Sequence, residues 1–346
     1  MAGMTAQSTA WPTLLDISRR LDPDGKIATV SEILTKYNEV LDDLPFVEGN
    51  LPTGHKTTVR ASLPAPTWRL LNKGVLPVKS TTNQIVETCG MMEAYSEIDK
   101  DLAMLNGNTA QWRLSEDAAV IEGMNQALTT ALIYGDTSVD PEKFVGLAPR
   151  YYQVNGGTSV TAGNVIDAGG GTNSTSIWLV GWSTDTIHGI FPKGSKAGLS
   201  MEDLGEQTIY DTQTPAGRYQ AYRTHYQWKV GLAVRDWRFV VRIANIGVVA
   251  LETAGDTSDT SANIIKYMSQ ALDKLPPTGN VRPVFYMNQR VRAMLRVKML
   301  SKSNAFITLD NLQGPSITRP TLSFMGVPCR RVDGLLNTET ALTTTT

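Results

Sequence analysis

Three histidines and two cysteines are the residues of this chain whose side chains could most readily bind a metal. His55, His188 and His225 each lie far in sequence from any other histidine or cysteine. Zinc sites use several such ligands at short, defined spacings, and no such spacing occurs here. We therefore predict no metal site and no cofactor. Cys89 and Cys329 are expected to be free thiols, because two distant cysteines make no disulfide framework.

The sequence also lacks the patterns of a catalytic nucleophile or a phosphate site. A Gly-x-Ser-x-Gly motif is absent, and Cys89 has no basic neighbour in sequence that would stabilise a thiolate. Residues 189–196, GIFPKGSK, resemble a phosphate loop, but the serine precedes the lysine and no clear helix pattern follows. The sequence therefore predicts that this protein is not an enzyme.

Paired carboxylates are the remaining candidates for acid–base chemistry. Asp42–Asp43 and Glu116–Asp117 lie near the ends of predicted helices. Carboxylates near a helix end can act through capping and the helix dipole, and we interpret both pairs in this way.

Composition points to an ordinary globular protein made in a cytoplasm. Hydrophobic residues make up 41% of the 346 residues, charged residues 19%, and the formal net charge is −1. No apolar run of about 18 residues exists to span a membrane, and the N-terminus lacks the features of a signal peptide. We expect no membrane partner.

Charge is distributed in blocks. Residues 1–50 contain four basic and eight acidic side chains, residues 51–90 contain five basic and one acidic, and residues 281–333 contain nine basic and two acidic. Such blocks suit segments that meet oppositely charged surfaces, for example on neighbouring copies. Solvated surface faces are the alternative, and charge alone leaves both open.

Residues 46–90 have the most unusual composition. They combine four prolines and several glycines with many threonines and valines, which favour extended backbone. We predict a long two-stranded excursion that needs a partner surface, because an isolated hairpin is marginal in water.

Periodicity predicts the other elements. Helices are expected at 29–42, 93–105, 115–134 (capped by Ser115), 261–275 and 288–300 (capped by Asn288). Strands are expected at 177–182, 226–234, 239–246, 281–287 and 322–332, the third pairing with the second, with a loop at 153–176 and a frayed tail at 338–346. The helix at 288–300 and the residues just after it are basic, and could contact phosphate or acidic protein; their charged residues are Arg290, Arg292, Arg296, Lys298 and Lys302. The fold class is α+β.

The serial order of these elements resembles the tailed-bacteriophage major capsid proteins of the Hong Kong 97-like fold. Residues 226–246 are similar to the P-domain strand region of one branch of that family. Residues 283–295 look like its A-domain strand followed by a helix, and residues 326–333 resemble its late Gly-x-Pro strand. The likeness covers most of the chain.

The resemblance implies a division of the chain. It assigns 1–45 to an N-terminal arm, 46–92 to an extended E-loop and 115–134 to the spine helix. It assigns 93–150 and 215–245 to the P-domain, 151–214 and 246–336 to the A-domain, and 337–346 to a C-terminal tail.

The implied function is self-assembly into the icosahedral shell that encloses the double-stranded DNA of a tailed phage. Partners would be many copies of the chain as hexamers and pentamers, separate scaffolding, portal and decoration proteins, and non-specifically contacted DNA. Assembly would occur in the bacterial host cytoplasm, and the protein would end in the virion capsid. Alternatives are an encapsulin-like compartment, another virion protein, or a hydrolase with a β-rich domain. We expect intersubunit contacts at Arg60, Trp68, Arg69, Lys73 and Lys79.

Overall fold

The computed structural model describes residues 38–104, 109–171, 173–210, 217–253, 263–277, 280–300, 307–311 and 320–344. The chain divides into two compact units. In the described part, unit 1 comprises residues within 91–128 and 198–229, and unit 2 comprises those within 38–90, 129–197 and 230–344. Mixed helices and strands confirm the α+β class. The predicted helix at 29–42 lies mostly outside the described residues, which retain only α2 (Val40–Asp43).

Unit 2 is built on a seven-stranded mixed sheet in the order β11-β12-β13-β10-β5-β9-β4. Its strands are β4 (Val165–Asp167), β5 (Ser174–Trp182), β9 (Val240–Gly247), β10 (Arg282–Met287), β11 (Ile307–Asn311), β12 (Pro320–Phe324) and β13 (Val327–Arg331). Every residue of β5 is buried. A strand buried on both faces is expected to be continuously apolar rather than alternating, as the run at 177–182 is.

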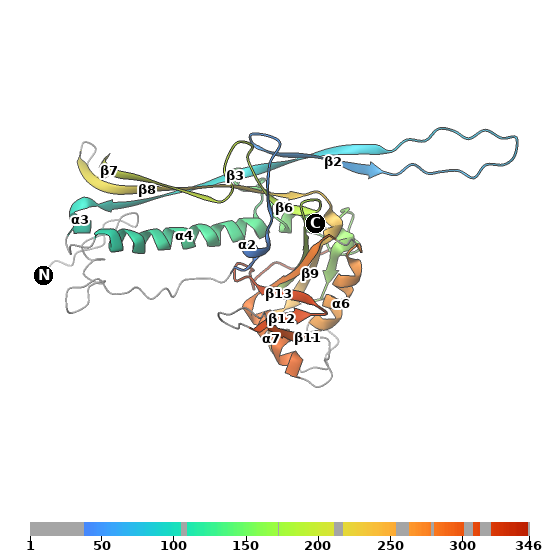
Figure 1. Cartoon of the computed structure of the whole chain (residues 1–346). Helices are drawn as coiled ribbons and strands as arrows, with labels where there is room; N and C mark the ends of the chain where they lie inside the picture. The colour runs from blue at the N-terminus through green and yellow to red at the C-terminus, as the bar shows by residue number, and fades with distance from the viewer. Residues whose placement is uncertain are drawn as a thin grey trace. The chain divides into compact units, whose positions relative to one another are not determined.

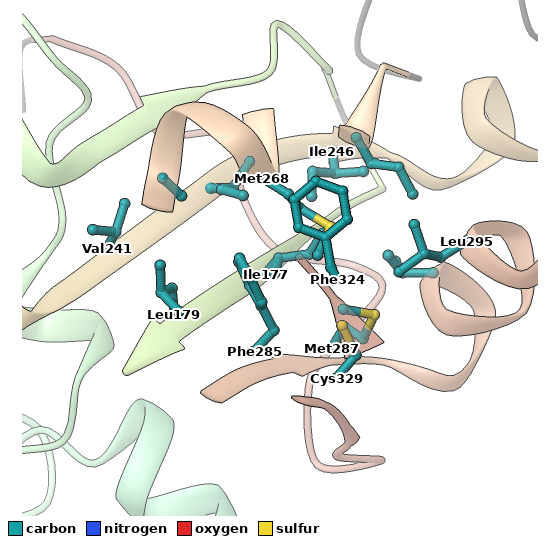
Figure 2. Close-up of a cluster of buried hydrophobic side chains, with 14 of the residues drawn as sticks. Ile177, Leu179, Val241, Ile246, Met268, Phe285, Met287, Leu295, Phe324 and Cys329 are labelled. Carbon is teal, nitrogen blue, oxygen red and sulfur yellow. The ribbon is translucent and has the colours of Figure 1, made fainter. Parts of the chain in front are cut away.

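Helices cover one face of this sheet. The helices are α6 (Ile264–Lys274) and α7 (Gln289–Leu300), and α5 (Val248–Thr253) packs beside α7. Met268 of α6 and Leu295 of α7 are fully buried in one cluster with Ile177, Phe285 and Phe324 of the sheet (Figure 2). Burying a side chain of this size stabilises the fold by about 1.5–3 kcal/mol. This cluster is the main core of unit 2.

A second group of strands in unit 2 leads to a hairpin. β1 (Phe46–Glu48) pairs in parallel with β6 (Ile187–Phe191), and β6 pairs with the last residues of β8 (Arg218–Val234). β2 (Gly54–Ser62) pairs antiparallel with the start of β3 (Thr81–Asp99). The expected two-stranded excursion is confirmed, and Figure 1 shows its connecting segment running on beyond the two paired strands.

Unit 1 contains residues of three strands and two helices. β8 lies between β7 (Leu199–Tyr210) and β3. The helices are α3 (Lys100–Met104) and α4 (Thr109–Tyr134), the latter 26 residues or about 39 Å long and continuing into unit 2. Ile98, Ala103 and Trp112 are buried together as its small core. No helix in the described ranges is long and apolar enough to cross a membrane.

Several predicted elements differ from the observed ones. The helix predicted at 93–105 is a strand as far as Asp99, because alternate residues contact β8, and only α3 is helical. The helix predicted from Ser115 begins at Thr109, because burial of Trp112 extends it. Ser115 is therefore an interior helix residue, not a cap.

The remaining corrections concern the strands. The segment 239–246 was expected to pair with 226–234, but β9 pairs with β5 and β4. The strand predicted at 322–332 is two strands, because Met325 and Gly326 both have positive φ and reverse the chain. The loop at 153–176 contains β4 and the start of β5. The polar strand β7 and short β6 were not predicted. The helices at 261–275 and 288–300 and the strand at 281–287 are confirmed, and Asn288 accepts a hydrogen bond from the Arg290 amide at 3.1 Å.

The C-terminal segment is anchored rather than frayed. Glu339 is buried and its carboxylate contacts the Arg242 guanidinium at 3.0 Å. Further along, the Asn245 side chain exchanges two hydrogen bonds with the backbone of Leu342, and the Val154 amide donates to the Thr343 carbonyl. The prediction that this segment is frayed was wrong. Hydrogen bonds and an ion pair between polar groups, rather than apolar contacts, hold it in place.

Candidate assembly surface

The hairpin of β2 and β3 is fixed firmly at its base in unit 2. The Asn50 side chain exchanges two hydrogen bonds of 2.7 Å with the backbone of Lys56. Glu87 on β3 is buried, and its two carboxylate oxygens accept from the Arg150 guanidinium at 2.7 and 2.6 Å. Two-pronged pairs of this kind fix orientation as well as contributing energy. The base of the hairpin is therefore a rigid support.

The segment beyond the two strands has no core of its own. All residues from 60 to 79 are exposed. A turn at Leu70–Lys73 reverses the chain: the Lys73 amide donates to the Leu70 carbonyl at 3.2 Å, and Asn72 has a φ of 63°. Asparagine is one of the few residues that adopts this left-handed conformation readily. The turn places the side chains at its tip in solvent.

Large apolar side chains line this exposed segment. Trp68 is fully exposed, Leu71 is 92% exposed and Leu76 is 84% exposed. The other exposed apolar residues of the hairpin are Leu63, Leu70, Val75, Val78, Ile85 and Val86. A monomeric protein seldom exposes so many large apolar residues together, and such patches mark interaction surfaces. We call residues 54–88 the hairpin surface.

All five predicted contact residues lie on the hairpin surface. Arg60 is near the end of β2, and the other four lie in the loop or just before β3. The structure brings Arg69 and Lys73 together, since the Arg69 Nε donates to the Lys73 carbonyl at 3.0 Å. Arg60, Trp68 and Lys79 are spread along the hairpin. All five side chains are exposed to solvent.

Each histidine ring lies against another ring, a feature that the sequence spacing did not predict. The rings of His55 and His188 are 5.8 Å apart, edge to face. His188 is 1% exposed, and burial, together with His55 and Arg235, lowers its pKa to about 4. His225 stacks on Tyr95 at 4.5 Å. Within the described ranges no group of three or more potential ligands is placed to hold a metal.

Neither the two cysteines nor the segment that resembles a phosphate loop has the environment of a reactive site in the described chain. Burial raises the pKa of Cys89 to about 11 and that of Cys329 to about 12, so neither is an activated thiolate. The phosphate-loop resemblance begins inside β6, where Gly189 pairs with Phe46. A phosphate-binding loop instead follows a strand and precedes a helix.

The paired carboxylates differ from their predicted roles. Asp43 is buried, and it contacts the Arg282 guanidinium at 2.9 Å, the Arg330 guanidinium at 3.2 Å and the Tyr286 hydroxyl at 3.1 Å. Glu116 and Asp117 lie two turns inside α4 rather than at its start. The end of α2 is thus tied to the sheet of unit 2 by two ion pairs of the buried Asp43 carboxylate rather than acting as a helix cap.

Two arginines of the basic helix α7 lie near carboxylates of the same chain. Arg292 lies 3.8 Å from Glu39 and Arg290 lies 3.7 Å from Glu252. Arg296 is exposed and Lys302 lies outside the described residues.

The sequence analysis did not predict the buried polar network around Arg242 and Glu339. Arg242 is 4% exposed and Glu339 is 7% exposed, and the pair also contacts Ser176 and Tyr134. The Arg242 guanidinium stacks on Trp178 at 4.8 Å. The only sequence signal was an arginine inside an otherwise apolar strand, FVVRIANI, which must have a buried partner.

Comparison with known proteins gives consistent matches. A family model described as major capsid protein GP7 matches residues 22–343. The structure of bacteriophage Epsilon15 includes a chain 33% identical to this one, with a TM-score of 0.77 and coverage of 99% of both chains. The bacteriophage JBD30 capsid matches at 9% identity over 88% of this chain and 93% of its own, with a TM-score of 0.45. Among curated protein sequences, no match was found.

Proposed function

This chain belongs to the major capsid protein GP7 family, and from that premise we propose how its parts build a phage shell. The observation that carries the function is the 33% identity to a chain of bacteriophage Epsilon15 over 99% of both chains. The chain is a major capsid protein of a tailed phage, a structural protein that assembles with copies of itself in the virion. Its fold is the Hong Kong 97-like capsid fold.

The finer division of the chain belongs to the proposal. Residues 1–45 form the N-terminal arm, 46–92 the E-loop and α4 the spine helix. Residues 93–150 and 215–245 form the P-domain, 151–214 and 246–336 the A-domain, and 337–346 the C-terminal tail. The exposed hairpin and the long helix support this division, because each is the element that the assignment requires at that place in the chain.

The hairpin surface joins one copy to its neighbours in this proposal. Its base is rigid, while its apolar side chains have no cover within unit 2 in the described part of the chain. Burying them against a neighbouring copy removes apolar area from water and favours association. Arg60, Trp68, Arg69, Lys73 and Lys79 are the contact residues.

The shell is icosahedral, is built of hexamers and pentamers, and encloses double-stranded DNA. Such a shell closes when copies of the same fold form both hexamers and pentamers. Separate scaffolding, portal and decoration proteins take part, and the packaged DNA is contacted without sequence preference. The capsid function is favoured over an encapsulin-like compartment or a hydrolase because the matching family model describes a major capsid protein.

The test is expression of the chain alone and together with a candidate scaffolding protein, followed by electron microscopy and sizing. Closed shells with hexameric and pentameric rings are the expected result. Monodisperse monomers under every condition of salt, pH and protein concentration would contradict the proposal.

A further inference from the structure

Helix α7 and the strand that it contacts, β13, concentrate positive charge in unit 2. The helix contains four basic residues and no acidic residue over Gln289–Leu300, and β13 ends with two further arginines. The buried cluster of unit 2 covers the apolar side of the helix, where Val291 and Leu295 are fully buried. The basic side chains therefore lie around the rest of the helix surface.

Three of these arginines converge at one place, which we call the arginine cluster. Arg292 and Arg296 are four residues apart on α7 and therefore share a face of the helix. Arg331 of β13 reaches the start of the same helix, since its guanidinium donates to the Gln289 side chain at 2.9 Å. Burial lowers the pKa of the Arg292 guanidinium, and the positive charges of Arg296 and Arg331 act in the same direction, while Glu39 opposes them. Like charges are thus held close together at this site.

The carboxylates of the described chain only partly neutralise the arginine cluster. Asp333 pairs with Arg331 at 2.6 Å. Glu39 has one oxygen 3.8 Å from the Arg292 guanidinium, which is longer than a hydrogen bond, and its other oxygen accepts from the Arg331 backbone amide at 3.1 Å. The Arg292 Nε is buried without a hydrogen-bond partner in the described chain, and Arg296 is exposed and forms no ion pair with a described residue. Both arginines therefore have donors and positive charge left for an anion from outside.

The chemistry of the arginine cluster fits a phosphate backbone better than an acidic protein. Guanidinium groups bind phosphate oxygens through paired hydrogen bonds. Double-stranded DNA has one negative charge per about 1.7 Å of its axis, so neighbouring arginines can each contact a phosphate. Exposed pairs with the separate carboxylates of a protein surface add little affinity. Single-stranded nucleic acid is bound by stacking on aromatic side chains, and α7 and β13 contain none.

We propose that the arginine cluster binds the phosphate backbone of double-stranded DNA, the packaged genome, without sequence preference. The inference rests on the proposed function, which places DNA inside the shell, and it names the residues that make the contact. Arg292 and Arg296 contact phosphates directly, and Arg331 adds positive charge beside them. Glu39 competes with phosphate for Arg292 and limits the strength of the contact. The contact is therefore weak and depends strongly on salt.

Binding of the unassembled protein to a short fluorescent DNA duplex of mixed sequence tests the inference, with anisotropy measured at several salt concentrations. The arginine variant, Arg292→Gln with Arg296→Gln, is expected to bind about tenfold more weakly. Its slope of log affinity against log salt should be smaller by about two, one for each phosphate contact that is lost. The matched control removes two exposed lysines from a loop of unit 2, Lys193→Gln with Lys196→Gln, and should bind like the wild type.

Thermal unfolding shows first that each variant is folded. If the arginine variant does not fold, the exposed position Arg296→Gln alone keeps the test, and its salt slope should be smaller by about one.

A third variant should change affinity in the opposite direction. Glu39→Gln keeps an oxygen that accepts from the Arg331 amide, but it removes the negative charge beside Arg292. It is expected to bind the duplex more tightly than the wild type, a result that loss of structure would not produce. Unchanged or weaker binding by the folded Glu39→Gln protein would contradict the inference.

The remaining outcomes separate this inference from the proposed function. Equal duplex binding by the arginine variant and the lysine control, or no duplex binding by the wild type at low salt, overturns the inference. Polyglutamate that binds the cluster more tightly than the duplex does also overturns it, in favour of an acidic protein. Wild-type protein that never forms shells contradicts the proposed function instead, because the duplex measurement uses unassembled protein.

Discussion

His188 is a buried imidazole in β6, and its ring lies against His55 at the base of the hairpin. Desolvation lowers its pKa to about 4, and the positive charges of His55 and Arg235 act in the same direction, while a hydrogen bond to the Ser183 backbone and the charge of Asp185 oppose them. Burial disfavours the charged imidazole at this site and favours the neutral one. The residue therefore makes stability depend on pH.

We predict that the free energy of unfolding falls as the pH is lowered from about 6.5 to about 4. In that interval the unfolded chain binds a proton at His188 and the folded chain does not, so each step down in pH favours unfolding. The full shift corresponds to about 3 kcal/mol. The measurement is the urea midpoint of the unassembled protein as a function of pH.

The control for this prediction is the variant His188→Gln, which should have a shallower dependence on pH over the same interval than the wild type. A wild-type slope in the His188→Gln protein would show that other groups cause the effect.

At the scale of elements, one apolar stripe of α4 is exposed near the start of the helix and buried near its end. Leu114, Ile121 and Leu128 are seven residues apart and therefore share a face of the helix. Leu114 is 70% exposed and Ile121 is 40% exposed, while Leu128 is 2% exposed. Gly123 lies in the middle of this helix, and a Cβ atom there would meet nothing within 4 Å.

Gly123→Ala is expected to stabilise the unassembled protein by about 0.5–1 kcal/mol, because alanine loses less backbone entropy in a helix and no neighbour has to move. Urea unfolding measures the change. Gly135→Ala is the matched comparison and should destabilise, because its Cβ would lie 2.4 Å from the Phe144 carbonyl oxygen. A loss of stability in Gly123→Ala would contradict the helix geometry.

For the whole molecule, folding and assembly place different demands on the chain. The buried cluster of unit 2 and the Arg242–Glu339 pair hold a single copy together. The hairpin surface adds little to that stability, because its side chains are already in solvent. Variants in the hairpin should therefore separate the two properties.

The double variant Trp68→Ser with Leu71→Ser should unfold within about 0.5 kcal/mol of the wild type, as surface substitutions usually do. Shell formation, measured by sedimentation and electron microscopy, should nevertheless fall sharply, because the apolar contact is lost. Val160→Ser, another exposed apolar position in unit 2, provides the control and should assemble normally. Equal assembly of both variants would argue against the hairpin as a joining surface.

Local sequence patterns determined several of the helices and strands of this protein. The run at 177–182, the amphipathic helix at 261–275, the Asn288 cap and the proline- and threonine-rich hairpin are all confirmed, because each depends on residues close together in the chain. The order of these elements was enough to indicate the capsid family. The basic charge of the hairpin was also visible from composition alone.

Only the tertiary structure decided the features that depend on distant partners. Residues 93–99 have helical spacing but form a strand, because β8 provides Arg223 and His225 opposite Glu97 and Glu93. The polar C-terminal segment is fixed because Glu339 neutralises an arginine almost 100 positions away. A strand needs hydrogen-bond partners on another strand, and a buried charge needs an opposite charge. Residues adjacent in sequence provide neither. The chain alone therefore reveals which groups need partners, and the fold determines which partners they find.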